Sequence, residues 1–80
     1  MNRIEIGQRL KELRLQKGMN CQQVGNIIGT SEVAILHYEA GRRMPNEINR
    51  AKYALLFGVE VLDLFAQDEG VLKGDQKKGV

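Results

Sequence analysis

Apolar residues recur three and four positions apart through most of residues 1–65, which is the period of α-helices that bury one face. A first helix is predicted over residues 2–17, and its buried face is formed by Ile6, Leu10 and Leu13. The charged residues of this segment lie mostly on its other faces. Gly7 is a poor helix former, so we expect either close packing at Gly7 or a later helix start.

Residues that favour helix ends divide the rest of the chain. Asn2 with Glu5 has the spacing of a capping box, and Asn20 and Asn46 are typical caps of later helices. Pro45 disfavours helix just before Asn46. Glycine suits the left-handed conformation in which many helices end, and the predicted stops are Gly18, Gly41 and Gly58.

Residues 20–41 have the pattern of two short helices joined by a tight turn. Their apolar residues share one face of each helix, namely Val24 and Ile28 in the first and Ile35 and Tyr38 in the second. Gly25 leaves room where the two helices cross, and Gly29 stands where the chain must reverse in about three residues. Thr30 or Ser31 then caps the second helix. This segment therefore predicts a helix-turn-helix.

Two further helices complete the predicted domain. One covers residues 47–57, where Ile48, Ala51 and Leu55 repeat at helical spacing. A short fifth helix over residues 59–65 is expected to add Val59, Leu62 and Phe65 to the core. Residues 66–80 lack apolar periodicity and predict a disordered tail. The predicted fold is all-α, a compact five-helix domain over residues 1–65 with a flexible tail.

Length and composition narrow the range of functions. Eighty residues make one small domain, in which a deep catalytic cleft is difficult to build. The formal net charge is +2, and residues 66–80 carry equal numbers of acidic and basic residues, so the excess belongs to residues 1–65. No nucleophile paired with a base and no phosphate-binding glycine loop is present, so neither an enzyme nor a cofactor is expected.

Cysteine and histidine are each present once. A single cysteine cannot form an internal disulfide, and Cys21 and His37 do not have the spacing of metal ligands. No basic leader or long apolar run occurs, so we expect a cytoplasmic protein that does not enter a membrane.

The second helix of the helix-turn-helix leaves part of its surface unused by packing. By spacing, the outward residues are Glu32, Val33, Leu36 and His37. This outward surface is the predicted working surface of the protein.

From residue 6 to residue 65 the chain resembles the DNA-binding domain of the phage Cro and repressor type, which many bacterial regulators share. The matching strings are IGQRLKELRLQKGMN, QQVGNIIGTSEVAILHYEAGRRMP and ALLFGVEVLDLF. The resemblance covers about three quarters of the chain and combines an arginine in the first helix with several features at family spacing. These features are Gly18, Gly29, Ile35, the Glu39-Ala40-Gly41 step, Pro45 and the Gly58-Val59 pair.

The resemblance implies that the second helix of the motif lies in the DNA major groove. The base-contacting positions are then Ser31, Glu32, Val33 and His37. Ser31 could donate to a base or a phosphate, Val33 could pack on a thymine methyl group, and Glu32 could accept from a cytosine amino group. His37 could donate to a purine acceptor. Each has a simpler reading, because Ser31 is also a cap, Glu32 also complements the helix dipole and an exposed His37 is ordinarily only solvated.

Phosphate contacts are expected from Asn20, Arg42, Arg43 and Arg9. Arg42 and Arg43 are the strongest candidates, because they adjoin the second helix of the motif and no acidic residue follows until Glu47. For Asn20 the alternative is a cap, and for Arg9 it is a solvated charge.

Arg14 and Glu39 stand where similar proteins form a partly buried ion pair between the first helix and the recognition helix. A paired charge is tolerable between packed helices, whereas a lone charge is costly. We therefore expect Arg14 and Glu39 to form a structural ion pair.

The chain also departs from the family pattern. Cys21 replaces a glutamine that touches phosphate in many relatives, and its alternatives are a small buried residue or a redox-sensitive thiol. Arg50 stands where relatives have an apolar core residue, which predicts a register shift or a snorkelled side chain. Gly25 replaces the more usual alanine. Ile27 and Leu36 are apolar where relatives are polar.

Two functions follow from these features. The first is a sequence-specific DNA-binding transcriptional regulator, expected to be a repressor of phage, mobile-element or restriction-controller type. It would be a homodimer on a palindromic operator of double-stranded DNA, with Val61 and Leu64 near its dimer interface. The second is a protein-interaction module, such as an anti-repressor or antitoxin-like partner, that uses Val33 and Leu36. No small-molecule ligand is expected for either.

Overall fold

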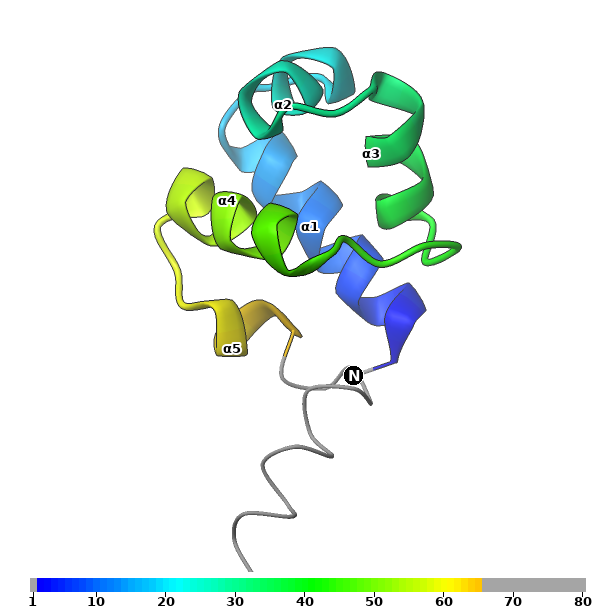
Figure 1. Ribbon diagram of the computed structural model, residues 1–80, viewed down its shortest axis with the longest axis vertical. Helices are drawn as coiled ribbons and strands as arrows, with labels where there is room; N and C mark the ends of the chain where they lie inside the picture. Colours follow the sequence, from blue (N-terminus) through cyan, green and yellow to red (C-terminus); the bar gives the residue numbers. More distant parts are fainter. Residues whose placement is uncertain (1, 66–80) are drawn as a thin grey trace, which may run out of the picture.

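The computed structural model describes residues 2–65, and the regular secondary structure of this part of the chain is all α-helix (Figure 1). The helices are α1 (Arg3–Gln16), α2 (Cys21–Ile28), α3 (Glu32–Glu39), α4 (Glu47–Phe57) and α5 (Val61–Phe65). The predicted all-α, five-helix architecture is confirmed. The predicted tail over residues 66–80 lies outside the described residues.

Local capping sets the helix limits, largely as predicted. Asn2 and Glu5 form a reciprocal capping box, in which the main-chain N–H of each donates to the other's side chain at 2.9 Å. Asn46 caps α4, and Ser31 rather than Thr30 caps α3. The fifth helix begins at Val61, two residues later than expected, and the N–H of Val59 donates to the carbonyl of Ala54 at the end of α4.

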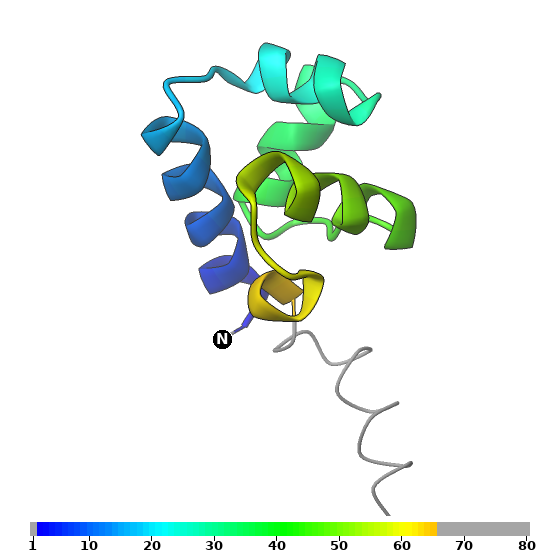
Figure 2. The ribbon, with the colours of Figure 1, turned by 90° about the vertical axis from the view of Figure 1, so that its left-hand side faces the viewer.

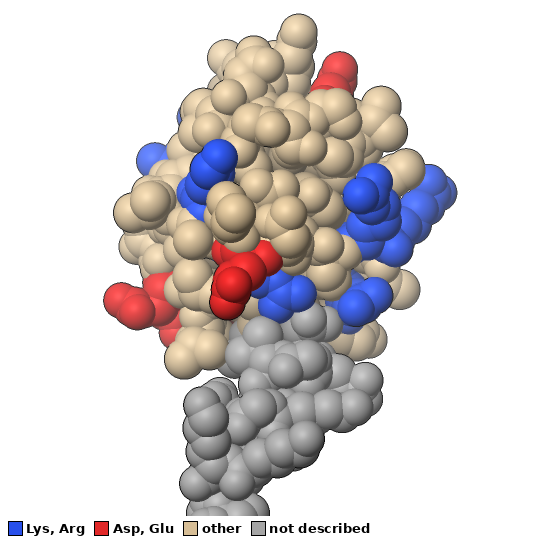
Figure 3. All heavy atoms as spheres, in the orientation of Figure 1, with Lys and Arg blue, Asp and Glu red and all other residues tan. Residues whose placement is uncertain are grey.

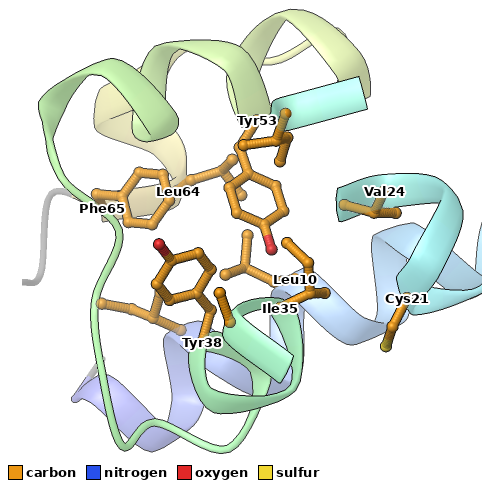
Figure 4. Close-up of a cluster of buried hydrophobic side chains, with 11 residues drawn as sticks. Leu10, Cys21, Val24, Ile35, Tyr38, Tyr53, Leu64 and Phe65 are labelled. Carbon is orange, nitrogen blue, oxygen red and sulfur yellow. The ribbon is translucent and has the colours of Figure 1, made fainter. Parts of the chain in front are cut away.

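The core lies where α1, α3, α4 and α5 converge, with α2 closing one end. Its fully buried side chains include Ile6, Leu10, Val24, Ile28, Ile35, Tyr53, Leu64 and Phe65. Figure 4 shows the rings of Tyr38, Tyr53 and Phe65 grouped together, and the centroids of Tyr38 and Phe65 lie 6.2 Å and 6.4 Å from that of Tyr53 respectively. Figures 1 and 2 show that α5 packs beside the first turns of α1.

The inward face of α4 is not the side on which Ile48, Ala51 and Leu55 repeat. Ile48 and Leu55 are 66% and 83% exposed, and Ala51 is exposed as well. Tyr53 and Ala54 are the buried residues of α4. Apolar residues repeat at helical spacing on two sides of α4, and the side that carries the large aromatic ring is the one that fills the core.

The inward residues of α5 also differ in part. Phe65 is buried and Val59 packs against the core, as predicted, but Leu62 is 54% exposed. Leu64 is fully buried, so its predicted place at a dimer interface is wrong. A helix of five residues makes little more than one turn, so apolar spacing alone does not distinguish Leu62 from Leu64.

Arg50 reaches the edge of the core without a register shift. Its guanidinium lies 5.1 Å from the centroid of the Phe65 ring, and its Nε donates to the carbonyl of Pro45 at 2.8 Å. The side chain therefore covers an aromatic residue while its charge stays hydrogen-bonded, which agrees with the snorkelled reading.

The predicted close packing at Gly7 is confirmed. A Cβ atom on Gly7 would overlap the main-chain carbonyls of Tyr38 and Glu39. Thus α1 and the end of α3 touch backbone to backbone, which fixes the direction of α3 relative to the rest of the domain.

Candidate nucleic-acid interface

The turn between α2 and α3 holds the two helices close together. Gly29 has a φ of +88°, which is a left-handed conformation that L side chains rarely adopt. The N–H groups of Gly29 and Thr30 both donate to the carbonyl of Gly25 at 2.8 Å. A Cβ atom on Gly25 would lie 2.9 Å from the carbonyl oxygen of Thr30, so this crossing needs a residue without a side chain.

The outward surface of α3 is exposed over its first turn and beyond. Val33 is 58% exposed and Leu36 is 48% exposed, and Glu32 is exposed as well. His37 was expected to point fully outward, but its side chain is half-buried. Ala34, Ile35, Tyr38 and Glu39 form the buried side of the helix.

The first two candidate base-contacting residues also have structural roles. The Oγ of Ser31 accepts from the N–H of Ala34 at 3.0 Å, which leaves the hydroxyl hydrogen available as a donor. Glu32 lies in the first turn of α3, where its carboxylate complements the positive end of the helix dipole. Both structural readings therefore hold, and both side chains remain exposed.

The arginine loop, residues 41–44, is fixed to the C-terminal end of α3. The N–H of Arg42 donates to the carbonyl of His37 at 3.0 Å, and the N–H of Gly41 donates to that of Tyr38 at 3.2 Å. This is the hydrogen-bond pattern of a Schellman motif. Gly41 has a φ of +76°, and a Cβ atom there would lie 2.9 Å from the Cα of Ile4. The loop is therefore held between α1 and α3.

The side chains of Arg42 and Arg43 are exposed on this loop. Figure 3 shows basic side chains gathered at the edge formed by the loop after α3, whereas acidic side chains lie mainly towards α5. The two arginines thus place positive charge beside the outward surface of α3, as the sequence predicted.

The other two candidate phosphate contacts, Asn20 and Arg9, have fewer side-chain donors available to a phosphate. Asn20 shares a reciprocal capping box with Gln23, using its main-chain N–H and its Oδ1 at 2.8 Å, and only its side-chain amide group remains as a donor. The capping role of Gln23 was not predicted, although its place three residues after Asn20 is the capping-box spacing. Arg9 is half-buried, and its buried Nε has no hydrogen-bond partner among residues 2–65.

Arg14 and Glu39 form the ion pair that the sequence predicted. Arg14 donates to both carboxylate oxygens of Glu39, through Nε at 2.6 Å and through Nη2 at 3.0 Å. Its Nη1 donates to the carbonyl of Met19 at 2.9 Å. The hydrogen bond to Glu39 raises the pKa of Arg14 above its ordinary value. The pair ties α1 and the segment after it to the last residue of α3.

Cys21 packs behind this ion pair and does not reach a surface for phosphate contact. It is 7% exposed, and its Sγ lies 3.9 Å from Oε1 of Glu39. Burial, followed by the nearby Glu39 carboxylate, raises the pKa of the Cys21 thiol. These surroundings favour a buried structural residue over a redox-sensitive thiolate.

Comparison with known proteins places this geometry in a family. A family model described as a helix-turn-helix domain matches residues 7–71. The chain belongs to this helix-turn-helix family.

Two relatives of the family are informative. The cryptic phage CTXphi transcriptional repressor RstR of Vibrio cholerae is 30% identical over 61 residues, which is 76% of this chain and 55% of that protein. The chain thus spans about half the length of this curated relative. The crystal structure of the restriction-modification controller protein C.AhdI from Aeromonas hydrophila matches with a TM-score of 0.69 and 31% identity. The match covers 78% of this chain and 90% of that one.

A second exposed surface of this helix-turn-helix domain was not expected. We use the name α4–α5 apolar face for the exposed apolar residues of the neighbouring helices α4 and α5, which are Ile48, Ala51 and Leu55 of α4 and Leu62 of α5. Beside it lies an open groove of about 480 Å³, lined by Pro45, Asn46, Glu47, Arg50, Ala51 and Val61. The helical spacing of Ile48, Ala51 and Leu55 is the signal in the sequence that could have indicated it.

Residues 2–65 have two further properties. No helix among them combines the length and apolarity needed to cross a bilayer. No three side chains of His, Cys, Asp or Glu within these residues group as metal ligands would.

Proposed function

We propose that the protein is a transcriptional regulator that binds double-stranded DNA sequence-specifically, with α3 in the major groove. The observation that carries this proposal is the exposed surface of α3 beside the arginine loop. A helix presented in this way fits the major groove of B-DNA, and cations at its end meet the phosphates along the groove. Membership of the helix-turn-helix family supports the proposal, as do the regulatory names of the two relatives.

The base contacts come from Ser31, Glu32, Val33 and His37. Glu32 is an acceptor and suits the amino group of cytosine, whereas Val33 suits a thymine methyl group. Ser31 adds a hydroxyl donor that discriminates little between bases. The cost of bringing the Glu32 carboxylate near phosphates is offset only where it finds such a donor.

Phosphate contacts come first from Arg42 and Arg43, whose side chains are exposed on a rigidly held loop. The remaining amide group of Asn20 adds a neutral donor at the start of α2. Arg9 adds a further cation from α1. Each phosphate neutralised by a cation releases counterions, so affinity falls steeply as salt rises.

A homodimer on a palindromic operator is part of the same proposal. Two half-sites about one helical turn apart require two copies of α3 related by a twofold axis. The α4–α5 apolar face is the surface that brings the copies together, because Ile48, Leu55 and Leu62 are each more than half exposed. Repression of a promoter that overlaps the operator, in the cytoplasm where that DNA lies, is the mode of action we propose.

A second function is favoured by the apolar character of α3. Val33 and Leu36 lie three residues apart on one side of the helix, and about half of each side chain is exposed. A protein partner docked on these two residues would make the domain an interaction module of anti-repressor or antitoxin-like type.

Selection of bound DNA from a random pool at physiological salt distinguishes the two functions. We expect an enriched palindromic motif for the wild type and altered motifs for Val33→Ala and His37→Ala. Leu15→Ala is the matched control, because Leu15 is 57% exposed on α1 and should leave the motif unchanged. Failure to enrich any motif, together with binding of a protein partner that hardly responds to salt, would favour the interaction module.

A further inference from the structure

The two ring nitrogens of His37 have different surroundings. Nδ1 is completely buried and has no hydrogen-bond partner among the described residues 2–65. The side chain as a whole is only half-buried, and Nε2 is not among the buried atoms that lack a partner. The part of the ring that reaches solvent from α3 is therefore the part that carries Nε2.

This arrangement decides where a neutral imidazole holds its proton. One ring nitrogen then carries N–H and the other a lone pair. A buried nitrogen without a partner loses its hydrogen bond to water in either form, but an orphaned N–H donor is rarer in folded proteins than an unsatisfied acceptor. The proton accordingly belongs on Nε2, which faces outward.

We propose that His37 presents a fixed N–H donor at Nε2 and reads bases through their hydrogen-bond acceptors. In the major groove these acceptors are N7 and O6 of guanine, N7 of adenine and O4 of thymine. Cytosine offers only its amino group there, which is itself a donor, so His37 rejects cytosine at the base it contacts. This inference rests on the proposed DNA-binding function and names the base class read at one position of each half-site.

The position of His37 on α3 supports this reading. His37 follows Val33 by four residues, so the two side chains lie on the same stripe of the helix, one turn apart. The main-chain carbonyl of His37 also accepts a hydrogen bond from the N–H of Arg42, so the arginine loop is attached to α3 at the residue that carries the ring. A phosphate contact by this loop would therefore hold the ring at a constant depth in the groove.

The tautomer can be measured without DNA. A long-range ¹H–¹⁵N spectrum of the ring distinguishes the two neutral tautomers from the imidazolium and assigns the protonated nitrogen. We expect the pattern of Nε2–H. A predominant Nδ1–H form would overturn the inference, whatever the protein binds. His37 is the only histidine in the chain, so the signals need no separate assignment.

Base selection tests the reading itself. For the wild type we expect one position in each half-site at which cytosine weakens binding about fivefold, the effect of one hydrogen bond. His37→Ala should lose this exclusion. His37→Gln should readmit cytosine, because an amide offers an acceptor as well as a donor. Leu15→Ala, at an exposed position of α1 away from the outward surface of α3, should keep the exclusion.

The possible failures are distinguishable. Specific binding in which cytosine is tolerated at every position, or excluded equally by His37→Ala, would overturn the reading by His37 and leave the proposed function standing. Absence of any DNA binding would overturn the proposed function and the base reading together, while the ring spectrum would still decide the tautomer.

Discussion

Glu39 connects more of the molecule than any other charged residue of α3. Both of its carboxylate oxygens accept from Arg14, and the thiol of Cys21 lies against one of them. The two charged side chains are 10% and 6% exposed, so either would be left in a poorly solvated place without the other. In an ion pair of this kind each charge offsets the cost of burying the other, and the net contribution of the pair to stability is small.

Mutation of the pair should therefore be strongly non-additive. We expect Arg14→Ala and Glu39→Ala each to lower the free energy of unfolding by about 3 to 5 kcal/mol, because each leaves a buried charge unpaired. The double variant should lose clearly less than the sum of the two. Thermal and urea unfolding of all three variants measures this coupling, and strictly additive losses would contradict a coupled pair.

Gly7 should resist a substitution that ordinarily stabilises helices. Replacing an interior helical glycine by alanine gains about 1 kcal/mol through helix propensity. A methyl group on Gly7, however, would overlap the carbonyls of Tyr38 and Glu39, which are main-chain atoms and cannot rotate away. We expect Gly7→Ala to lower the free energy of unfolding by about 1 to 3 kcal/mol.

Urea unfolding tests the Gly7 prediction. The adjacent variant Gln8→Ala, at an exposed position of α1, should change stability by less than about 0.5 kcal/mol. A Gly7→Ala protein more stable than the wild type would show that α1 and α3 are not in backbone contact.

The hydroxyl of Tyr53 is buried without a hydrogen-bond partner among residues 2–65, and Figure 4 shows it pointing towards Leu10 and Ile35. Removing such a group costs little and relieves its desolvation, so Tyr53→Phe should leave stability equal or raise it by about 1 kcal/mol. Tyr38→Phe is the matched comparison. The Tyr38 hydroxyl accepts from Nδ2 of Asn49 at 3.3 Å, and its loss should cost about 0.5 to 1 kcal/mol.

Alkaline pH provides a second measurement on Tyr53. Burial raises the pKa of Tyr53 above its ordinary value of 10.0, so the folded state keeps the phenolic proton more strongly than the unfolded state. The resulting stabilisation is complete below pH 10.0 and is lost progressively above it. Tyr53→Phe should therefore lose less stability than the wild type above pH 10.0, and an identical decline would contradict burial as the cause.

At the scale of elements, α3 and the arginine loop act as one rigid unit. The Schellman hydrogen bonds join the loop to α3. Gly41 brings the backbone of the loop against α1, and Gly7 brings the backbone of α1 against the end of α3. The charges of Arg42 and Arg43 are thus positioned by main-chain contacts, and their side chains can be changed without disturbing the fold.

Salt dependence should reveal the contribution of this loop. If Arg42 and Arg43 each neutralise one phosphate, the slope of log affinity against log salt should fall by about 1 in each single variant to Ala and by about 2 in the double variant. Lys11→Ala is the control, because Lys11 is exposed on α1 about 200° around the helix from Arg9 and is not expected to meet DNA. Unchanged slopes in the arginine variants would exclude these phosphate contacts.

The helix limits could be predicted because they depend on residues three or four positions apart. The capping pattern at Asn2 and the left-handed turn at Gly29 are local, and both occur in the structure. The inward face of α4 could not be predicted, because Ile48 and Leu55 fit helical spacing as well as Tyr53 does. Only the packing of Tyr53 against α3 and α5 decides between them.

The candidate site was predictable to a similar extent. The outward positions of Glu32, Val33 and Leu36 follow from the turn that sets the direction of α3. The half-burial of His37 depends instead on tertiary packing around the end of α3, which no spacing rule within the helix contains. The base and phosphate contacts assigned to these residues stay predictions.

At the scale of the whole molecule, the described surface has two unlike regions. The surface of α3 and the arginine loop combines polar, apolar and cationic groups, whereas the α4–α5 apolar face exposes mainly aliphatic side chains. Leu55 alone is 83% exposed, which is costly to leave in water on a domain this small. A twofold contact would bury this face and leave both copies of α3 free for DNA.

Leu55→Asp tests this assembly because it places a charge in the proposed contact without touching the core. In sedimentation equilibrium we expect the wild type to dimerise and Leu55→Asp to remain monomeric, with the same helix content by circular dichroism. Leu15→Asp, at an apolar position of α1 that is 57% exposed, should still dimerise. On a palindromic operator Leu55→Asp should bind more weakly and lose its preference for two half-sites over one, because the second subunit is no longer held beside the first. A wild type that stays monomeric at high concentration, or a Leu55→Asp protein that dimerises normally, would place the contact elsewhere or remove it.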